Sequence, residues 1–286
     1  MNVEDLAFEP LDRAGVATLV AWAAKEGWNP GVHDVDLFYE TDPNGFFGYF
    51  LDDELIGGGS LVSYGGAFGF MGLFIVKPEF RSQGIGRQLW LHRRDHLLSR
   101  LKEGASIGMD GVVDMQPFYN KGGFEIAFRD ERYEAVGRSF SISPFVSSMR
   151  EADFPEVSGL DLECFGFTRP DFLRAWLAQP DARSFVYRNA SGFQGFTLMR
   201  KTQVGYKIGP LFAASLEVAK DLYEACLDSA RGEPVYLDIP VSNPDAISLV
   251  REYGAEYVFE CARMYYGSPP DVPIQKIFGI TTFELG

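Results

Sequence analysis

The stretch Val76-Lys-Pro-Glu-Phe-Arg-Ser-Gln-Gly-Ile-Gly-Arg-Gln-Leu-Trp90 (VKPEFRSQGIGRQLW) decides the fold. It follows the apolar run MGLFIV and precedes a long, Leu-rich and charged segment, so it is predicted to be the corner between a strand and a helix over about residues 84–103. Glycines before a helix let the backbone approach an anion, and the first N–H groups of the helix have no intrahelical partner. The amides from Gln83 to Arg87, with Arg81 and Arg87 as cations, are therefore predicted to bind a pyrophosphate.

Other interpretations of this corner stay open on the motif alone. Tight turns use glycine for steric reasons, and Gly84 and Gly86 fit that role as well. A Rossmann site is disfavoured because the spacing is not GxGxxG and because the preceding strands form a meander rather than a βαβ unit. A P-loop is disfavoured because no Gly-Lys-Ser/Thr follows.

The segments on either side of the corner predict an α+β half. Residues 11–27 have helical periodicity, with Asp12 as the N-cap and Gly27 as the stop. The runs FFGYFL, LIGGGSLVSY and FGFMGLFIV are predicted strands, and the short turns between them indicate an antiparallel meander. After the corner and its helix come a strand, ASIGMDGVV, a short helix around PFYNKG, and a last strand, FEIAFRDERYEAV.

The same order of elements starts again after residue 146, which indicates an internal duplication. The segments GGFEIAFRDERY and YGAEYVFECARM align without gaps, so that Gly123 matches Gly254 and Arg132 matches Arg263. A chance match between two unrelated α+β halves is the alternative. We predict a first domain over residues 1–137, a linker over 138–146, and a second domain over 147–286.

Composition excludes several classes of partner. The 286 residues are 46% hydrophobic and 23% charged, as expected for a globular protein. Forty acidic residues against twenty-six basic ones give a formal charge of -14, which argues against nucleic acid or an anionic membrane and is compatible with a cationic substrate.

The location and the absence of a metal are also expectations from sequence. The cysteines at positions 164, 226 and 261 show neither metal-ligand spacing nor a disulfide framework, so no metal is expected. The acidic N-terminal residues lack the form of a signal peptide, and the apolar run AGVATLVAWAA is too short to span a bilayer. We expect a cytoplasmic protein.

At the corner the chain resembles the GNAT superfamily of acyl-CoA-dependent N-acyltransferases. The pattern Val76-x-Pro-x-x-Arg-x-x-Gly-x-Gly86 is similar to motif A of that family, and PFYNKGGF, residues 117–124, is similar to motif B. The resemblance covers about residues 8–137 well. The stretch GWNPG, the ending KIFGITTFELG and the duplicated layout resemble a tandem subfamily with a degenerate second domain.

The resemblance implies a mixed α/β fold, with tandem GNAT-like domains, each a splayed mixed sheet flanked by helices. Acetyl-CoA would be the cosubstrate, and its pantetheine arm would lie where the fourth and fifth strands separate. Backbone groups of three residues would bind the pantetheine: Phe74, Ile75 and Val76. Six residues would hold the pyrophosphate: Arg81, Gln83, Gly84, Ile85, Gly86 and Arg87.

The family's chemistry assigns further candidates. Tyr119 stands where the family keeps its general acid, and a phenol suits protonation of the leaving thiolate. The alternative is that Tyr119 only packs against the cosubstrate. Asp110 is the candidate base or amine-orienting group, and a turn-forming role before Gly111 is its alternative. Trp28, Asn29 and His33 lie on the loop where the family builds its acceptor pocket, although Asn-Pro-Gly is also a turn.

The second half lacks the features of the corner. Its equivalent segment, SLEVAK, residues 215–220, contains no glycine, and Val250 stands where the first half has Tyr119. We therefore expect one acetyl-CoA site per chain. The predicted function is transfer of an acetyl group from acetyl-CoA to a primary amine of a small molecule, by direct attack in a ternary complex. The acidic surface disfavours acceptors linked to tRNA. The alternative is an acyl-CoA-binding sensor or assembly module without turnover. A homodimer is compatible with the sequence.

Overall fold

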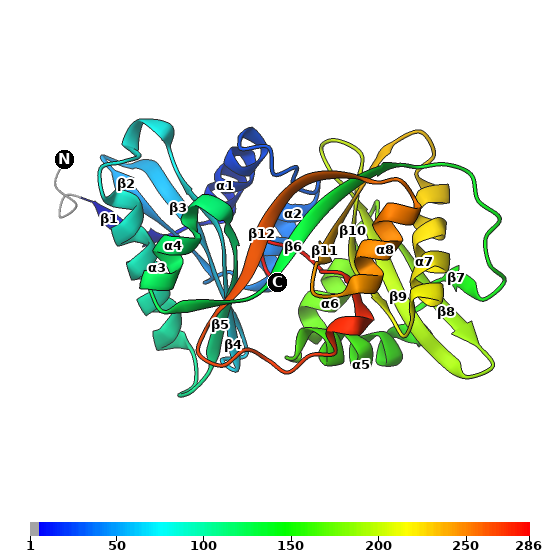
Figure 1. The fold of residues 1–286 in the computed structure, drawn as a ribbon. Coiled ribbons are helices and arrows are strands. Elements are labelled where there is room, and N and C mark those ends of the chain that lie inside the picture. The colour runs from blue at the N-terminus through cyan, green and yellow to red at the C-terminus, as the bar shows by residue number, and fades with distance from the viewer. Residues whose placement is uncertain (1–5) are drawn as a thin grey trace.

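The computed structural model describes residues 6–286, in which two similar halves share one continuous sheet (Figure 1). The elements of the first half are β1 (Ala7–Pro10), α1 (Arg13–Lys25), α2 (Asp34–Thr41), β2 (Phe46–Leu51), β3 (Glu54–Tyr64), β4 (Phe68–Val76), η2 (Pro78–Phe80), α3 (Ile85–Arg100), β5 (Ser106–Val112), η3 (Val113–Met115), α4 (Gln116–Lys121) and β6 (Phe124–Val136). Those of the second half are β7 (Val146–Ser148), η4 (Glu151–Asp153), α5 (Phe154–Phe165), α6 (Pro170–Leu177), β8 (Arg183–Asn189), β9 (Gly192–Lys201), β10 (Tyr206–Ala213), α7 (Leu216–Ser229), β11 (Pro234–Pro240), α8 (Pro244–Glu252), β12 (Glu256–Tyr266), η5 (Ile274–Lys276) and β13 (Ile277–Gly279).

Most of these elements match the expectation from sequence. The side chain of Asp12 accepts a hydrogen bond from Gly15 N and caps α1 as predicted, and β2, β3 and β4 form the antiparallel meander. Two helices and three short strands were not predicted: α2, α6, β1, β7 and β13. The helices α2 and α6 begin without a side-chain cap hydrogen bond, and the strands are too short to show a period, so their sequences carry little local signal.

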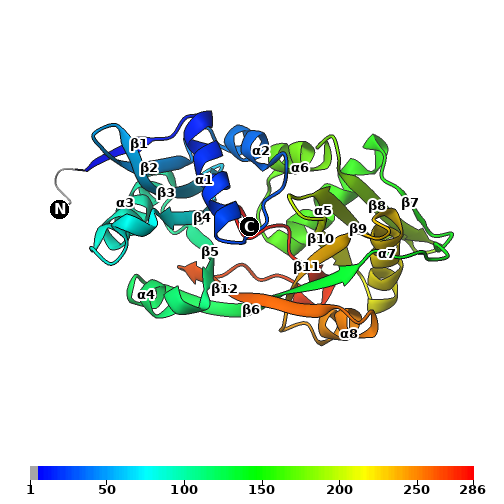
Figure 2. The ribbon, with the colours of Figure 1, turned by 90° about the horizontal axis from the view of Figure 1, so that it is seen from above.

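The strand order shows that the two halves exchange a strand. The sheet runs β1-β2-β3-β4-β5-β12-β6-β11-β10-β9-β8-β7. Thus β12 of the second half pairs with β5 of the first, and β6 of the first half pairs with β11 of the second. Figure 2 shows β6 and β12 as a long ribbon that passes between the halves. The division into two domains at residues 138–146 stays a prediction. The strands β6 and β12 each pair with strands from the other side of that division.

A local two-fold axis passes through this ribbon. Arg132 on β6 lies opposite Phe259 on β12, and Arg263 on β12 lies opposite Phe128 on β6. In the gapless sequence alignment, Arg132 corresponds to Arg263 and Phe128 to Phe259, so the two pairs are equivalent. Between them, Asp130 lies opposite Cys261, the position to which it aligns. The axis therefore runs between these two residues.

Helices cover both faces of the first-half strands. A Cβ atom added to Gly58 would meet Leu19 of α1, whereas one added to the neighbouring Gly57 would meet Leu89 of α3. Because successive side chains of a strand point to opposite faces, α1 and α3 lie on opposite sides of the sheet. The hydrophobic core on the α1 side also contains Phe172 and Trp176 of α6, so the two halves share a core.

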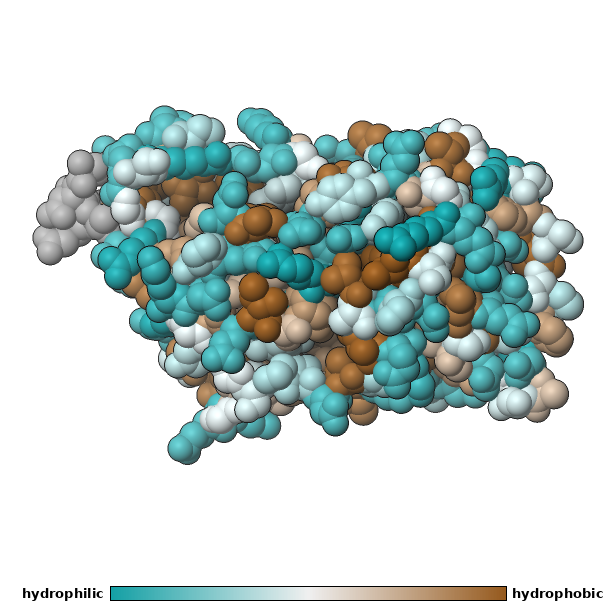
Figure 3. Space-filling view, viewed as in Figure 1, coloured by the Kyte–Doolittle hydropathy of each residue, from teal (hydrophilic) through white to brown (hydrophobic). Residues whose placement is uncertain are grey.

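The outer surface of the ribbon is mixed in character. The strands β6 and β12 carry exposed apolar side chains, among them Ile126, Val136 and Val258. On the face shown in Figure 3, hydrophobic residues stand in small groups separated by hydrophilic ones. Isolated apolar residues of this kind are normal on soluble surfaces. Within residues 6–286, no helix has both the length and the apolar character that a bilayer crossing needs.

Candidate active site

The strands β4 and β5 separate part-way along their length. They pair in parallel from Phe68 and Ser106 as far as Met71 and Met109, and then both continue without pairing to each other. A cavity of about 670 Å³ opens at this point and extends from the corner after β4 to the second half. Separation of the fourth and fifth strands is what the family resemblance implied, and the structure confirms it.

The predicted phosphate corner is built as a short 3-10 turn followed by the first residues of α3. Ser82 and Gly84 both have positive φ, 61° and 82°, so the chain turns sharply before the helix. The Arg81 Nε donates a hydrogen bond of 2.8 Å to Val76 O, which holds this side chain against the end of β4. Arg81 also pairs with Glu26 of the first helix–loop junction, whereas Arg87 is exposed at the same end of the cavity.

The corner has room for a pyrophosphate. No atom would lie within 4 Å of a Cβ placed on Gly84, and a Cβ on Gly86 would make only ordinary contacts, at 3.5 Å to Phe74 and 3.6 Å to Val76. Both glycines therefore leave the first amides of α3 open toward the cavity rather than filling a crowded turn. The residues present fit the phosphate end of acetyl-CoA.

A bulge in β4 turns its backbone toward the cavity. The pairing with β3 shifts between Gly58 and Ser60, and Leu73, opposite the shift, has a φ of 48°. From the α3 side, Arg93 Nη2 donates to the carbonyl oxygens of Ser60 and Gly72, the latter at 2.8 Å. The hydrogen-bond ladder between β3 and β4 is thus interrupted next to the cavity, where N–H groups of β4 can face a ligand. The buried guanidinium of Arg93 binds the carbonyl oxygens at the edge of this interruption.

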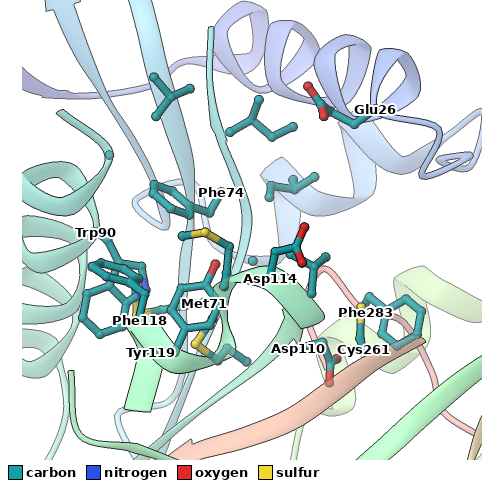
Figure 4. A pocket seen from close by; sticks show the side chains of 18 of the residues that line it. Glu26, Met71, Phe74, Trp90, Asp110, Asp114, Phe118, Tyr119, Cys261 and Phe283 are labelled. Atoms are coloured by element: carbon teal, nitrogen blue, oxygen red, sulfur yellow. The ribbon is translucent and has the colours of Figure 1, made fainter. Parts of the chain in front are cut away.

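Tyr119 lies deep in the same cavity. Figure 4 shows its side chain beside those of Trp90 and Phe118. The centroid of its ring lies 5.7 Å from that of Trp90 and 5.5 Å from that of Phe118, and only 4% of its surface is exposed. Its ring covers Gly111 so closely that a Cβ there would come within 2.9 Å. Burial raises the pKa of Tyr119, and the positive charge of Arg93 partly opposes this shift. The phenol is therefore protonated at neutral pH.

Asp110 lines the cavity from the opposite side, near Cys261 and Phe283 (Figure 4). Both carboxylate oxygens accept hydrogen bonds from Arg263 of β12, at 2.7 and 2.9 Å. This ion pair gives Asp110 a structural role that the sequence did not indicate. Its role as a base stays a prediction.

The structure divides the remaining predicted site residues into two groups. Those that line the cavity are Trp28, Phe74, Ile75, Val76, Arg81, Gly84, Gly86 and Arg87. Four do not line it: Gln83, Ile85, Asn29 and His33. Ile85, the first residue of α3, is buried in a hydrophobic cluster with Val76 and Leu89, and the Gln83 side chain donates to Glu79 O. Binding roles for all of these residues stay predictions.

The loop after α1 is fixed to the second half of the chain. Asn29 Nδ2 donates to Thr202 Oγ1 and to Val204 O, and His33 Nε2 lies 3.1 Å from a carboxylate oxygen of Asp181. These contacts hold the loop in place, so that Trp28 alone of the three predicted acceptor residues reaches the cavity. The sequence could not show this, because the partners lie far away along the chain.

The sequence analysis missed the contribution of the second half to the cavity. Four lining residues come from it: Phe259, Cys261, Phe283 and Glu284. Further lining residues that were missed belong to the first half: Glu26, Met71, Trp90, Arg93, Arg132, Asp114, Met115 and Phe118. Phe118 lies beside Tyr119 in motif B and Met115 lies just before that motif, which was the available signal. No local pattern points to residues 283 and 284.

The equivalent gap in the second half is filled by protein. The strands β10 and β11 pair in parallel only from Tyr206 to Ile208, and the short strand β13 then pairs with β10 beyond that point. Ile280 N donates to Asp238 O of β11, so the segment is bonded to both sides of the gap. A separate small cavity of about 20 Å³ lies near Phe212 and Ile277 and is not lined by β11.

Comparison with known proteins agrees with this architecture. Residues 14–124 match the family model described as acetyltransferase (GNAT) family, and residues 157–279 match a second model, acetyltransferase (GNAT) domain. The fold and the cavity therefore define an acyltransferase. The chain belongs to the GNAT superfamily and carries two GNAT domains in tandem.

Among curated proteins, the chain is similar to holothin acyltransferase of Pseudoalteromonas sp. (strain SANK 73390), with 28% identity over 267 residues, 93% of this chain and 89% of that one. It is also similar to the uncharacterised N-acetyltransferase YitH of Bacillus subtilis (strain 168), with 25% identity over 284 residues and 95% of both chains.

Among solved structures, a candidate acetyltransferase from Pyrococcus horikoshii superposes with a TM-score of 0.85 at 23% identity, covering 100% of this chain and 98% of that one. A tandem GNAT protein from the clavulanic acid biosynthesis pathway superposes with a TM-score of 0.63 at 16% identity, covering 93% and 100%. These identities support the shared fold.

Proposed function

We propose that the protein transfers an acetyl group from acetyl-CoA to a primary amine of a small molecule, by direct attack without a covalent enzyme intermediate. The observation that carries this proposal is the single cavity that joins the open corner at Gly84 to Tyr119 and Asp110. When bound, acetyl-CoA supplies an acyl group activated as a thioester. We place the reaction in the cytoplasm because acetyl-CoA is an intracellular metabolite.

The chain's own residues then have separate tasks. The first amides of α3, opened by Gly84 and Gly86, bind the pyrophosphate, and the bulge at Leu73 gives backbone N–H groups that stabilise negative charge developing on the acyl oxygen. The Tyr119 hydroxyl donates a proton to the departing sulfur. The Ser60 hydroxyl at the bulge is bonded to Glu284 O and Gly72 N, and burial raises the pKa of the Cys261 thiol. Neither group is activated as a nucleophile, which favours direct attack by the amine.

The acceptor end of the cavity suits a cationic amine that carries an apolar group. Its walls include the aromatic side chains of Trp28, Phe259 and Phe283 together with the acidic side chain of Asp114. The Arg132 guanidinium that also lines it is held by both carboxylate oxygens of Asp238, at 2.6 and 2.7 Å. The positive charge at this end is therefore compensated. Acceptors with an aromatic or other apolar body and one primary amine fit this lining best.

Calorimetry with acetyl-CoA tests the proposal, using Gly84→Glu and a matched control. Gly104 also has a positive φ, 78° against 82° for Gly84, and a Cβ on it likewise meets nothing within 4 Å. Glutamate at either position carries a similar backbone cost, but only at position 84 would its charge enter the predicted phosphate site. We expect one acetyl-CoA per chain in the wild type and in Gly104→Glu, and loss of binding in Gly84→Glu.

Release of free thiol from acetyl-CoA in the presence of a panel of primary amines completes the test. Amine-dependent release supports the enzyme. Binding without release by any amine would favour an acyl-CoA-binding module instead. Failure to bind at about millimolar acetyl-CoA, a free energy of only about -4 kcal/mol, would overturn the proposal.

A further inference from the structure

Four carboxylates line the cavity, and they differ in their partners. Asp110 is bonded to Arg263 and Glu26 to Arg81, while Asp114 is exposed. Glu284 is buried, with 4% of its surface exposed, and has no ion-pair partner among the described residues. Its Oε2 accepts a hydrogen bond from the hydroxyl of Thr282. Glu284 is thus the buried carboxylate of the cavity whose charge is not already paired.

The position of Glu284 is fixed against the bulge of β4. Its carbonyl oxygen accepts a hydrogen bond of 3.3 Å from Ser60 Oγ, and Ser60 Oγ in turn accepts one of 2.8 Å from Gly72 N. A Cβ on Gly72 would lie 2.1 Å from that carbonyl oxygen and 3.0 Å from the Cα of Glu284. Gly72 therefore permits a backbone contact that sets Glu284 next to the strand on which the acyl group is expected.

The segment that carries Glu284 is itself held firmly. The Tyr64 hydroxyl donates to Leu285 O at 2.8 Å, and Arg169 Nη1 donates to Gly286 O at 2.7 Å. Upstream, β13 fills the gap between β10 and β11. A carboxylate with both neighbouring backbone segments bonded in this way is preorganised, as a proton-transfer group has to be.

We propose that Glu284 is the proton acceptor for the attacking amine, delivered to the first-half active site by the second half of the chain. This inference rests on the proposed function. As the amine nitrogen forms its bond to the acyl carbon, Glu284 takes a proton from that nitrogen. As the carbon–sulfur bond breaks, the Tyr119 hydroxyl gives a proton to the sulfur.

The protons balance over a turnover. The carboxylic acid of Glu284 and the phenolate of Tyr119 return to their starting forms by exchange with solvent once the products leave. An amine that enters as an ammonium ion releases one additional proton to solvent. Three charged side chains of the sheet face Glu284 without an ion pair to it: Arg132 of β6, Lys207 of β10 and Asp110 of β5. Because Arg132 is bound by Asp238 and Asp110 by Arg263, the Glu284 carboxylate is left to attract the ammonium form of the amine before the reaction.

The variant Glu284→Gln keeps the size of the side chain and removes its charge. Glu163→Gln is the matched control, since Glu163 is also in the second half, pairs with Lys276 at 2.6 Å and is half exposed. Thiol release from acetyl-CoA with tyramine and tryptamine is measured from about pH 6 to about pH 9. We expect Glu284→Gln to lose about a hundredfold in kcat at neutral pH and to recover partly as the pH rises, because more of the amine is then unprotonated.

A binding measurement supplies a readout that does not depend on turnover. With CoA present, calorimetry compares tyramine with tyrosol, in which a hydroxyl group replaces the amine. Glu284→Gln is expected to weaken tyramine binding about tenfold and leave tyrosol and acetyl-CoA binding unchanged, whereas Glu163→Gln changes none of them.

The outcomes separate the two proposals. If the wild type releases no thiol with any amine, the proposed function fails and the role of Glu284 fails with it. If the wild type turns over and Glu284→Gln matches it in kcat and in its pH profile, only the role of Glu284 is overturned. Thermal unfolding of both variants establishes that each is folded, so a loss of activity reports on the charge.

Discussion

Arg263 of the second half and Asp110 of the first are joined by two hydrogen bonds, of 2.7 and 2.9 Å, across β12 and β5. The equivalent pair, Arg132 of the first half and Asp238 of the second, is joined at 2.6 and 2.7 Å across β6 and β11. An arginine of each half therefore forms an ion pair with an aspartate on a strand of the other half. All four side chains are almost completely buried.

The first prediction concerns the stability of this contact. Replacing Asp110 by Asn should lower the free energy of unfolding by about 3 kcal/mol, because Arg263 would be left buried without its counter-charge. Urea unfolding followed by circular dichroism measures the change. The kcat of the folded variant, measured in the same samples, tells whether Asp110 also acts in catalysis.

An exposed pair serves as the control for that experiment. Arg174 and Glu151 lie 2.8 Å apart with side chains 54% and 84% exposed. Replacing Glu151 by Gln should change the free energy of unfolding by no more than about 0.5 kcal/mol. If the substitutions at positions 110 and 151 lowered the free energy of unfolding equally, the structural importance of the buried pair would be contradicted.

The second prediction is that residues 1–137 do not fold alone. In the full chain, β5 pairs with β12 and β6 pairs with β12 and β11, so this fragment would expose the edge of β5 and leave β6 without its partners. We expect aggregation or a broad, non-cooperative thermal transition for the fragment. Co-expression with residues 138–286 should restore a cooperative transition. A monomeric, cooperatively folded fragment would show that the exchanged strands are dispensable.

These two predictions concern features that the sequence did not reveal. The corner at Gly84, the cap at Asp12 and the meander were predicted because neighbouring residues determine them. The exchange of β6 and β12 was not predicted. The alternation of apolar and polar residues along a strand is the same whichever strand it pairs with. The gapless alignment did contain both Arg132 and Arg263, but it gave no sign that each reaches an aspartate of the other half.

The candidate site was also predicted only where its residues are close together in the sequence. Residues of motifs A and B line the cavity because they belong to one local strand–helix unit. Glu284 was missed because it reaches the site through a chain segment that crosses between the halves. Asn29 and His33 are drawn away from the cavity by Thr202 and Asp181, partners that lie far along the sequence.

The third prediction tests Tyr119. Tyr119→Phe removes the hydroxyl and keeps the ring that packs on Trp90, so kcat should fall about a hundredfold while acetyl-CoA affinity changes little. Burial raises the pKa of Tyr119, so the wild type should show no alkaline loss of activity from this group below its ordinary pKa of about 10. Steady-state kinetics and calorimetry give both quantities. Unchanged kcat would restrict Tyr119 to packing.

The fourth prediction concerns pH and Lys207, whose Nζ lies 3.4 Å from Trp28 O. Burial lowers the pKa of Lys207 to about 8 from its ordinary 10.5, so between these values the unfolded chain holds a proton that the folded protein has lost. Stability due to this group therefore rises from about pH 8 to about pH 10.5, by roughly 3 kcal/mol, and is lowest below pH 8.

Comparison of the wild type with Lys207→Met isolates that contribution. The free energy of unfolding is measured in urea at several pH values across this range, and the difference between the two proteins is taken at each. As the pH rises, the free energy of unfolding of the wild type should increase relative to that of the variant. A difference that stays constant with pH would mean that Lys207 keeps its ordinary pKa in the folded protein.

The axis between Asp130 and Cys261 bears on how such a chain can be built. In a symmetric pair of identical subunits, any residue on a two-fold axis faces its own copy. Two aspartates meeting at this depth would repel each other, since Asp130 is completely buried. Joining both copies in one polypeptide removes the constraint, because each side of the axis can change independently. A carboxylate on one side and a thiol on the other is an arrangement that two identical subunits cannot form.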